Sequence, residues 1–193
     1  DVFDQEVGED DMAPLTDFLD FINNSDDSTF TAELGDRLDV EAFATYLAFQ
    51  DLIGNADDID GRGNNSYLQY DTSNEQFTVV SWDLNLAFDT ANVGSGGGVN
   101  GAGDRPKGAP GAAAGAAAGS NVLVERFMAD ADFAELYATK TAELTEQLYD
   151  SGAAEESIAQ WSELLTNNAG DLVSPGTVSA EAEALLDYID TPR

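Results

Sequence analysis

The stretch from residue 39 to residue 88 constrains the fold most, because it predicts a buried helix, a polar loop and a β-hairpin in that order. Asp39 is a good N-cap, and Gly54 is the kind of residue at which helices commonly end. Apolar side chains cover a broad face of the helix between them: Phe43, Tyr46, Leu47, Leu52 and Ile53. Such a wide apolar face is typical of a helix at the centre of a domain.

Two short runs after this helix predict strands that pair antiparallel. A polar loop, residues 55–66, is followed by the runs Tyr67–Asp71 and Phe77–Trp82, with turn-forming residues between them. We expect this hairpin to pack against the preceding helix. Because the hairpin returns the chain, it can bring the acidic residues near Asp57 close to those near Asp83.

The rest of the chain is predicted to be helical apart from one low-complexity segment. Apolar residues at helical spacing predict helices at Pro14–Ile22, in a short segment around 30–38, in two runs from Val122 separated by a cap at Asp130 or Asp132, at Ser157–Asn167 and at Ser179–Ile189. Residues 92–120 are rich in Gly and Ala and predict a flexible insert within one domain. The expected fold class is α+β, mostly helical, with a short antiparallel hairpin.

The charge balance excludes a nucleic-acid binder. The chain has 38 acidic and 7 basic residues and a net charge of -31, so it lacks the basic face that nucleic acid requires. The acidic residues are spread along the whole chain, which favours a solvated surface adapted to high salt over a dedicated cation-binding surface. This composition resembles that of halophilic proteins. No apolar run approaches the roughly 20 residues that span a membrane.

The absence of Cys and His from the sequence limits the chemistry of any site. Thiol nucleophiles, thiolate zinc sites and His bases are excluded, so a bound metal must take oxygen ligands, as Mg, Mn and Ca do. The loop over residues 55–65 is not an EF-hand, because aligning Gly61 with the central Gly places Ala56 at the first ligand and Tyr67 at the required Glu. A looser Ca site and an Asx-rich turn both remain open for this loop.

Asp83 stands out because it directly follows an apolar strand. A carboxylate at a buried strand end is costly unless it is paired or bound to a metal, although capping of the next turn is an alternative. If the chain stays extended there, Asn85 lies on the same side as Asp83, and the two can share a cation.

The sequence resembles the CotH kinase family, the spore-coat-protein-H-like atypical protein kinases. The resemblance is carried by three blocks: Asp39 to Asp57 with its Tyr-Leu-Ala, Gln and Leu-Ile-Gly-Asn, then Asn65 to Asp71, then Trp-Asp-Leu-Asn-Leu-Ala-Phe ending at Phe88. The segments 121–126 and 133–137 resemble the family's sequence after a variable Gly-rich insert. The similarity extends over about Leu15 to Ile189.

The resemblance implies a kinase-like fold that binds ATP and Mg (or Mn) and phosphorylates Ser or Thr of a partner protein. Asp57 matches the family's catalytic loop Asp. Asn65 and Asp83 match residues that hold metal and nucleotide, and Asn85 stands where the family often has a second metal-binding Asp. Phosphoryl transfer needs carboxylates that place the metal and one that orients the nucleophile.

No Lys precedes Lys107, so the phosphate-anchoring Lys of a kinase is not in this sequence. We therefore expect residues 1–193 to be the C-terminal portion of the kinase domain. Two other interpretations stay open: a catalytically inactive pseudokinase acting as a cell-surface binding or structural protein, and a Ca-stabilised extracellular domain. The family resemblance favours an extracellular or cell-surface location. The protein substrate does not follow from the sequence.

Overall fold

The computed structural model describes residues 6–8, 11–55, 57–61, 65–88 and 121–191. The predicted insert over 92–120 lies outside these residues. The elements are α1 (Ala13–Asn24), α2 (Asp27–Glu33), η1 (Leu34–Asp36), α3 (Val40–Ile53), β1 (Ser66–Asp71), β2 (Gln76–Ser81), η2 (Leu84–Leu86), α4 (Val122–Ala129), α5 (Ala131–Thr145), η4 (Glu146–Asp150), α6 (Ala153–Asn168) and α7 (Pro175–Ile189). The fold is thus α+β and mostly helical, as predicted.

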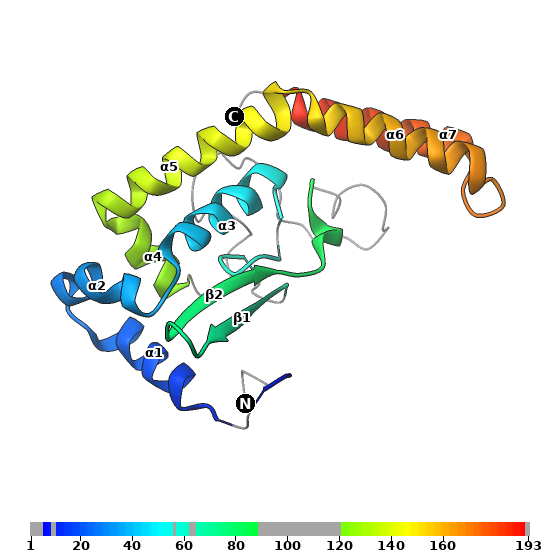
Figure 1. Cartoon of the computed structure of the whole chain (residues 1–193). Helices are drawn as coiled ribbons and strands as arrows, with labels where there is room; N and C mark the ends of the chain where they lie inside the picture. Colours follow the sequence, from blue (N-terminus) through cyan, green and yellow to red (C-terminus); the bar gives the residue numbers. More distant parts are fainter. Residues whose placement is uncertain (1–5, 9–10, 56, 62–64, 89–120, 192–193) are drawn as a thin grey trace.

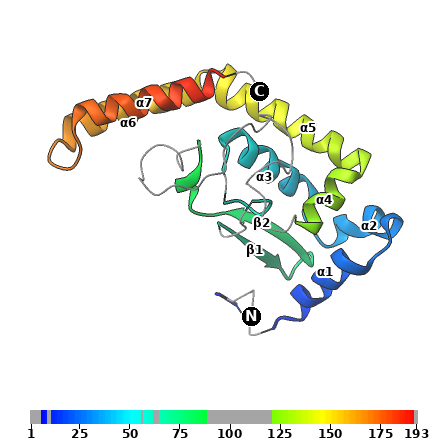
Figure 2. The same cartoon turned by 180° about the vertical axis from the view of Figure 1, so that it is seen from behind.

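Helix α3 lies in the middle of the body, with the β1–β2 hairpin on one side and α5 on another (Figure 1). Helices α1 and α2 close one end of the body together with α4. Helices α6 and α7 form an antiparallel pair that extends away from the body beyond the end of α5 (Figure 1). The view from behind shows the same projecting helix pair (Figure 2).

The ends of α3 are fixed by the two residues that the sequence predicts. The Asp39 side chain accepts a hydrogen bond from the Ala42 amide at 2.9 Å. Gly54 has a φ of 58°, in the left-handed region that favours glycine at a helix C-terminus. The buried side chains of α3 include Phe43, Tyr46 and Leu47, and this confirms the central helix.

The hairpin is anchored to the chain just before α3. Phe77 donates its amide to the Arg37 carbonyl at 2.7 Å and accepts at its carbonyl from the Asp39 amide at 2.9 Å. Within the hairpin the strands pair antiparallel, with Tyr67 opposite Val80 and Tyr70 opposite Phe77. The predicted hairpin and its packing on α3 are confirmed.

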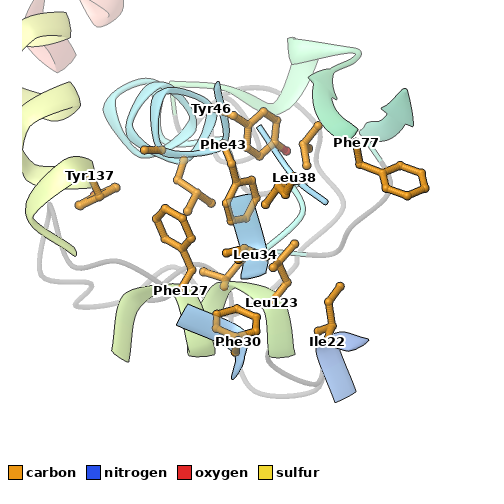
Figure 3. Close-up of a cluster of buried hydrophobic side chains, with 14 of the residues drawn as sticks. Ile22, Phe30, Leu34, Leu38, Phe43, Tyr46, Phe77, Leu123, Phe127 and Tyr137 are labelled. Atoms are coloured by element: carbon orange, nitrogen blue, oxygen red, sulfur yellow. The ribbon is translucent and has the colours of Figure 1, made fainter. Parts of the chain in front are cut away.

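Aromatic side chains fill the core between these elements (Figure 3). The Phe43 ring meets the Phe127 ring edge-on with centroids 5.0 Å apart, and Phe127 stacks on Phe133 at 4.8 Å. Phe18 stacks on Phe77 at 4.8 Å, which ties α1 to the hairpin. Aromatic pairs of this kind add about 0.5–1.5 kcal/mol beyond the area that they bury.

Two helices, α2 and α7, begin earlier than the apolar pattern predicts, because a polar cap sets the start. The Asp26 side chain accepts from the Thr29 amide, so α2 starts at Asp27. The Ser174 hydroxyl accepts from the Thr177 amide, with Pro175 at the first position of α7. Of the two predicted caps between α4 and α5, Asp130 is the one used. None of the helices in the described ranges is long and apolar enough to cross a membrane.

Candidate functional site

A chain of buried amides joins the end of α3 to the hairpin and to the following loop. Gln50 and Asn55 are only 0% and 2% exposed. The Asn55 Nδ2 donates to Gln50 Oε1 at 2.8 Å, and Gln50 Nε2 donates to the Ser81 hydroxyl at 2.8 Å. The amide of Asp57 donates to Asn55 Oδ1 at 3.2 Å. Both segments that the sequence singles out are therefore connected to the same residue of α3.

Asn65 makes a second connection between the two segments. Its amide donates to the Asp57 carbonyl at 3.0 Å, and its carbonyl accepts from the Trp82 amide at 3.0 Å. Its side-chain Nδ2 donates to the Asp83 carbonyl at 2.8 Å. The structure thus brings together the backbones of three of the predicted site residues, Asp57, Asn65 and Asp83.

The first half of the loop is largely buried. Asp57 and Asp58 are 7% and 4% exposed. The Ile59 amide donates to the Tyr46 hydroxyl oxygen at 3.1 Å, which anchors the loop to α3. Burial raises the pKa of Tyr46 to about 12, and the nearby Asp58 carboxylate adds to the rise. Tyr46 therefore stays neutral near pH 7 and acts as an anchor for the loop.

Asp83 has a different environment from the one expected. Its side chain is exposed, so the argument from a buried strand end is wrong. Its backbone has φ 42° and ψ 77°, in the left-handed region, and the chain continues into the 3₁₀ turn η2 with no hydrogen bond from the Asp83 side chain to cap it. The chain is not extended there, so the alternation that placed Asn85 beside Asp83 does not apply. Asn85 lies in this turn and is exposed.

The left-handed backbone at Asp83 is itself informative. Non-glycine residues seldom adopt a positive φ, and such conformations cost on the order of 1–3 kcal/mol and gather at functional sites. Beside it, the exposed rings of Tyr67 and Trp82 meet edge-on with centroids 6.0 Å apart. The outer face of the hairpin next to Asp83 is therefore aromatic and accessible.

The donor atoms of this region suit a hard divalent cation. Carboxylate and amide oxygens are the ligands that Mg and Ca take in proteins. Within the described part of the chain, no three acidic side chains are grouped closely enough to hold a metal ion by themselves. The predicted metal ligands differ from such a group, because they combine one carboxylate, Asp83, with two amides, Asn65 and Asn85.

Sequence reasoning missed the residues that link the two segments, Gln50, Asn55 and Ser81. The available signal was Gln50, a polar residue on an otherwise apolar helix face four residues before Gly54. A buried polar side chain requires a partner, and this requirement pointed to an internal hydrogen-bond network.

The end of the central helix, a loop with buried carboxylates and the Asp83 residue with positive φ after the hairpin thus lie together in this part of the fold. The family model for the CotH kinase protein matches residues 3–192, which is nearly the whole chain. This chain belongs to the CotH kinase family. A search of curated proteins found no match.

Proposed function

We propose that this chain contributes the catalytic loop and the metal site of a protein kinase that transfers the γ-phosphate of ATP to Ser or Thr of a partner protein. The observation that carries the proposal is the pair of bonds from Asn65, its amide to the Asp57 carbonyl and its Nδ2 to the Asp83 carbonyl. These bonds keep a candidate base and a candidate metal ligand in one site. Family membership supports the same reading.

Asp83 and Asn65 are the proposed metal ligands. The exposed Asp83 carboxylate is accessible to a cation, and Asn65 keeps Oδ1 for a metal because its Nδ2 is already bonded to Asp83. Asn85 lies within two residues of Asp83 and supplies a further amide oxygen from the η2 turn. Bound Mg or Mn would supply positive charge that neutralises the phosphates during transfer.

Asp57 is the proposed residue that orients the acceptor hydroxyl. Its carboxylate would accept the hydroxyl proton while the hydroxyl oxygen forms its bond to the γ-phosphorus and the bond from that phosphorus to the ADP oxygen breaks. The Asn55 bond to the Asp57 amide holds the backbone at this position. Replacement of Asp57 by Asn should therefore preserve nucleotide binding and abolish transfer.

Thermal unfolding with and without Mg and ATP tests the proposal. A ligand present at 100 times its Kd stabilises the native state by about 2.7 kcal/mol. We expect Mg and ATP together to raise the Tm of the unmodified chain, and we expect this rise to vanish in Asp83→Asn. Asp187→Asn is the matched control, because it removes one negative charge from an exposed position on α7 and should keep the rise.

The same titration separates the alternatives. A rise in Tm with Ca alone and no further rise with nucleotide would assign the residues around Asp57 to a structural Ca site. No rise with any of these ligands would contradict the proposal and would support a binding protein that keeps the family fold without catalysis. A rise that persists in Asp83→Asn would place the nucleotide elsewhere.

A further inference from the structure

We infer that Gln50, Asn55 and Ser81 are positioning residues that fix the separation of the segments carrying Asp57 and Asp83. They are neither metal ligands nor substrate-binding residues in the proposed function. Their catalytic meaning rests on the proposed function, whereas the hydrogen bonds that carry the inference belong to the fold itself.

The orientation of each amide follows from one backbone donor. The Asp57 amide can only donate, so the atom of Asn55 that faces it is Oδ1, and Nδ2 faces Gln50. Gln50 must then present Oε1 to Asn55 and Nε2 to Ser81. The Ser81 hydroxyl oxygen accepts this bond. The direction of the whole chain of bonds is thus determined, and each side chain has one specific role.

The chain of bonds closes into a ring with Asn65. From Ser81 the backbone leads through Trp82 to Asp83, whose carbonyl accepts from Asn65 Nδ2. The Asn65 amide donates to the Asp57 carbonyl, and the Asp57 amide donates to Asn55. The Asp57 and Asp83 segments are therefore joined by Asn65 directly and also by the buried amides through α3.

Core packing alone does not account for an amide at position 50. Gln50 is completely buried, and an apolar side chain of similar length would fill the same volume without polar atoms that need partners. A buried amide that lacks its partner is destabilising, so Gln50 is suited to its place only when Asn55 and Ser81 are both in position. The network is therefore complete only when the segments that carry Asn55 and Ser81 have the separation seen in this structure.

Positioning matters because phosphoryl transfer depends on placement of its groups. A displacement of about 1 Å can lower a rate roughly a hundredfold. Loss of the bond from Gln50 to Ser81 would remove the side-chain link through α3. The bonds of Asn65, the pairing of Ser66 with Ser81 and the bond from the Phe88 amide to the Ile53 carbonyl would remain. We expect this loss to weaken binding of Mg and ATP about tenfold and to lower transfer by more.

Replacement of Ser81 by Thr and by Val gives a matched test. Both side chains are β-branched, similar in shape and suited to a strand, and only Thr keeps the hydroxyl that accepts from Gln50. Two quantities would be measured in the full chain: the affinity for Mg·ATP, and the hydrogen exchange of the Asn65 and Trp82 amides. A core variant with the same loss of stability, Ile22→Val, controls for general destabilisation.

The inference predicts that Ser81→Thr behaves as the unmodified chain. It also predicts that Ser81→Val loses about tenfold in Mg·ATP affinity and exchanges both amides about tenfold faster. Equal values for Thr and Val in both measurements would overturn the inference and leave the proposed function intact. If the unmodified chain does not bind Mg·ATP, the proposed function fails, and the exchange rates alone still decide whether the Ser81 hydroxyl holds the two segments.

Discussion

Gly54, where the loop of the candidate site begins, gives the sharpest prediction about the fold. A Cβ atom added at this position would lie 2.3 Å from the Tyr188 hydroxyl oxygen and 3.3 Å from its ring carbon Cζ. The backbone there has a φ of 58°. Gly54→Ala therefore forces an alanine into the left-handed backbone region. It also makes the new methyl group collide with the Tyr188 side chain of α7.

The magnitude follows from the contacts that would be lost. A left-handed backbone costs a non-glycine residue roughly 1–2 kcal/mol. Displacing Tyr188 removes its hydrogen bond to the Leu52 carbonyl at 3.3 Å and its edge-on contact with Phe88 at 5.3 Å. These contacts contribute about 0.5–1.5 kcal/mol each. The expected loss in the free energy of unfolding is about 2–5 kcal/mol.

A double-mutant cycle measured by urea unfolding separates the two causes. Tyr188→Phe alone should cost about 1 kcal/mol, because Tyr149 still donates to the Leu52 carbonyl at 2.9 Å. In the Tyr188→Phe background the colliding oxygen is gone and the ring carbon at 3.3 Å needs only a small shift, so Gly54→Ala should cost little more than its left-handed backbone conformation. The two changes should therefore be non-additive by about 1 kcal/mol or more.

Gly35→Ala is the control for adding a methyl group to the chain, because no atom lies within 4 Å of a Cβ at that position. It should change stability little. If Gly54→Ala and Tyr188→Phe were additive within about 0.5 kcal/mol, the close approach of Tyr188 to Gly54 would be refuted.

Two further predictions concern pH. The Ser28 hydroxyl and then the Thr29 amide lower the pKa of Asp26 from 3.8 to about 2, so its contribution to stability is present above pH 4 and is lost as the pH falls towards 2. Asp26→Asn should flatten this part of the acid unfolding curve, and an unchanged curve would contradict the cap. Burial raises the pKa of Tyr46 from 10.0 to about 12, so its contribution is present below pH 10 and is lost as the pH rises towards 12, by about 2 kcal/mol. Tyr46→Phe should remove that alkaline loss in equilibrium unfolding, and an equal loss in the variant would contradict the assignment.

The sequence was sufficient for the central helix and the hairpin because each is encoded locally. Asp39 and Gly54 mark the ends of α3 by their own backbone preferences, and the two apolar runs around a polar turn allow little but a hairpin. Family motifs then predicted Asp57, Asn65 and Asp83 as site residues, and the structure brings their backbones together. The helix starts at Asp27 and Pro175 were placed too late, because the polar caps before them carry no apolar signal.

The environment of Asp83 could not be predicted in the same way. Its positive φ lies where the chain leaves β2 and enters η2, and its carbonyl accepts a bond from Asn65, which is 18 residues away in the sequence. The partners of Gln50 were equally inaccessible, since Asn55 is five residues away and Ser81 is 31 residues away. Periodicity identifies which side of a helix is buried, but it does not identify the partner of a buried polar group.

The position of Mn bound together with ATP tests most directly whether Asp57, Asn65 and Asp83 form one phosphoryl-transfer site. A paramagnetic ion broadens the NMR signals of nearby backbone amides, and the broadening that appears only with ATP reports the metal–nucleotide site. We expect the amides of Asp57, Asn65 and Asp83 to be broadened most, and we expect Asp83→Asn to abolish the effect. ATP-dependent broadening centred on the acidic helices α6 and α7, or no such broadening anywhere, would contradict the claim that these three residues form one phosphoryl-transfer site.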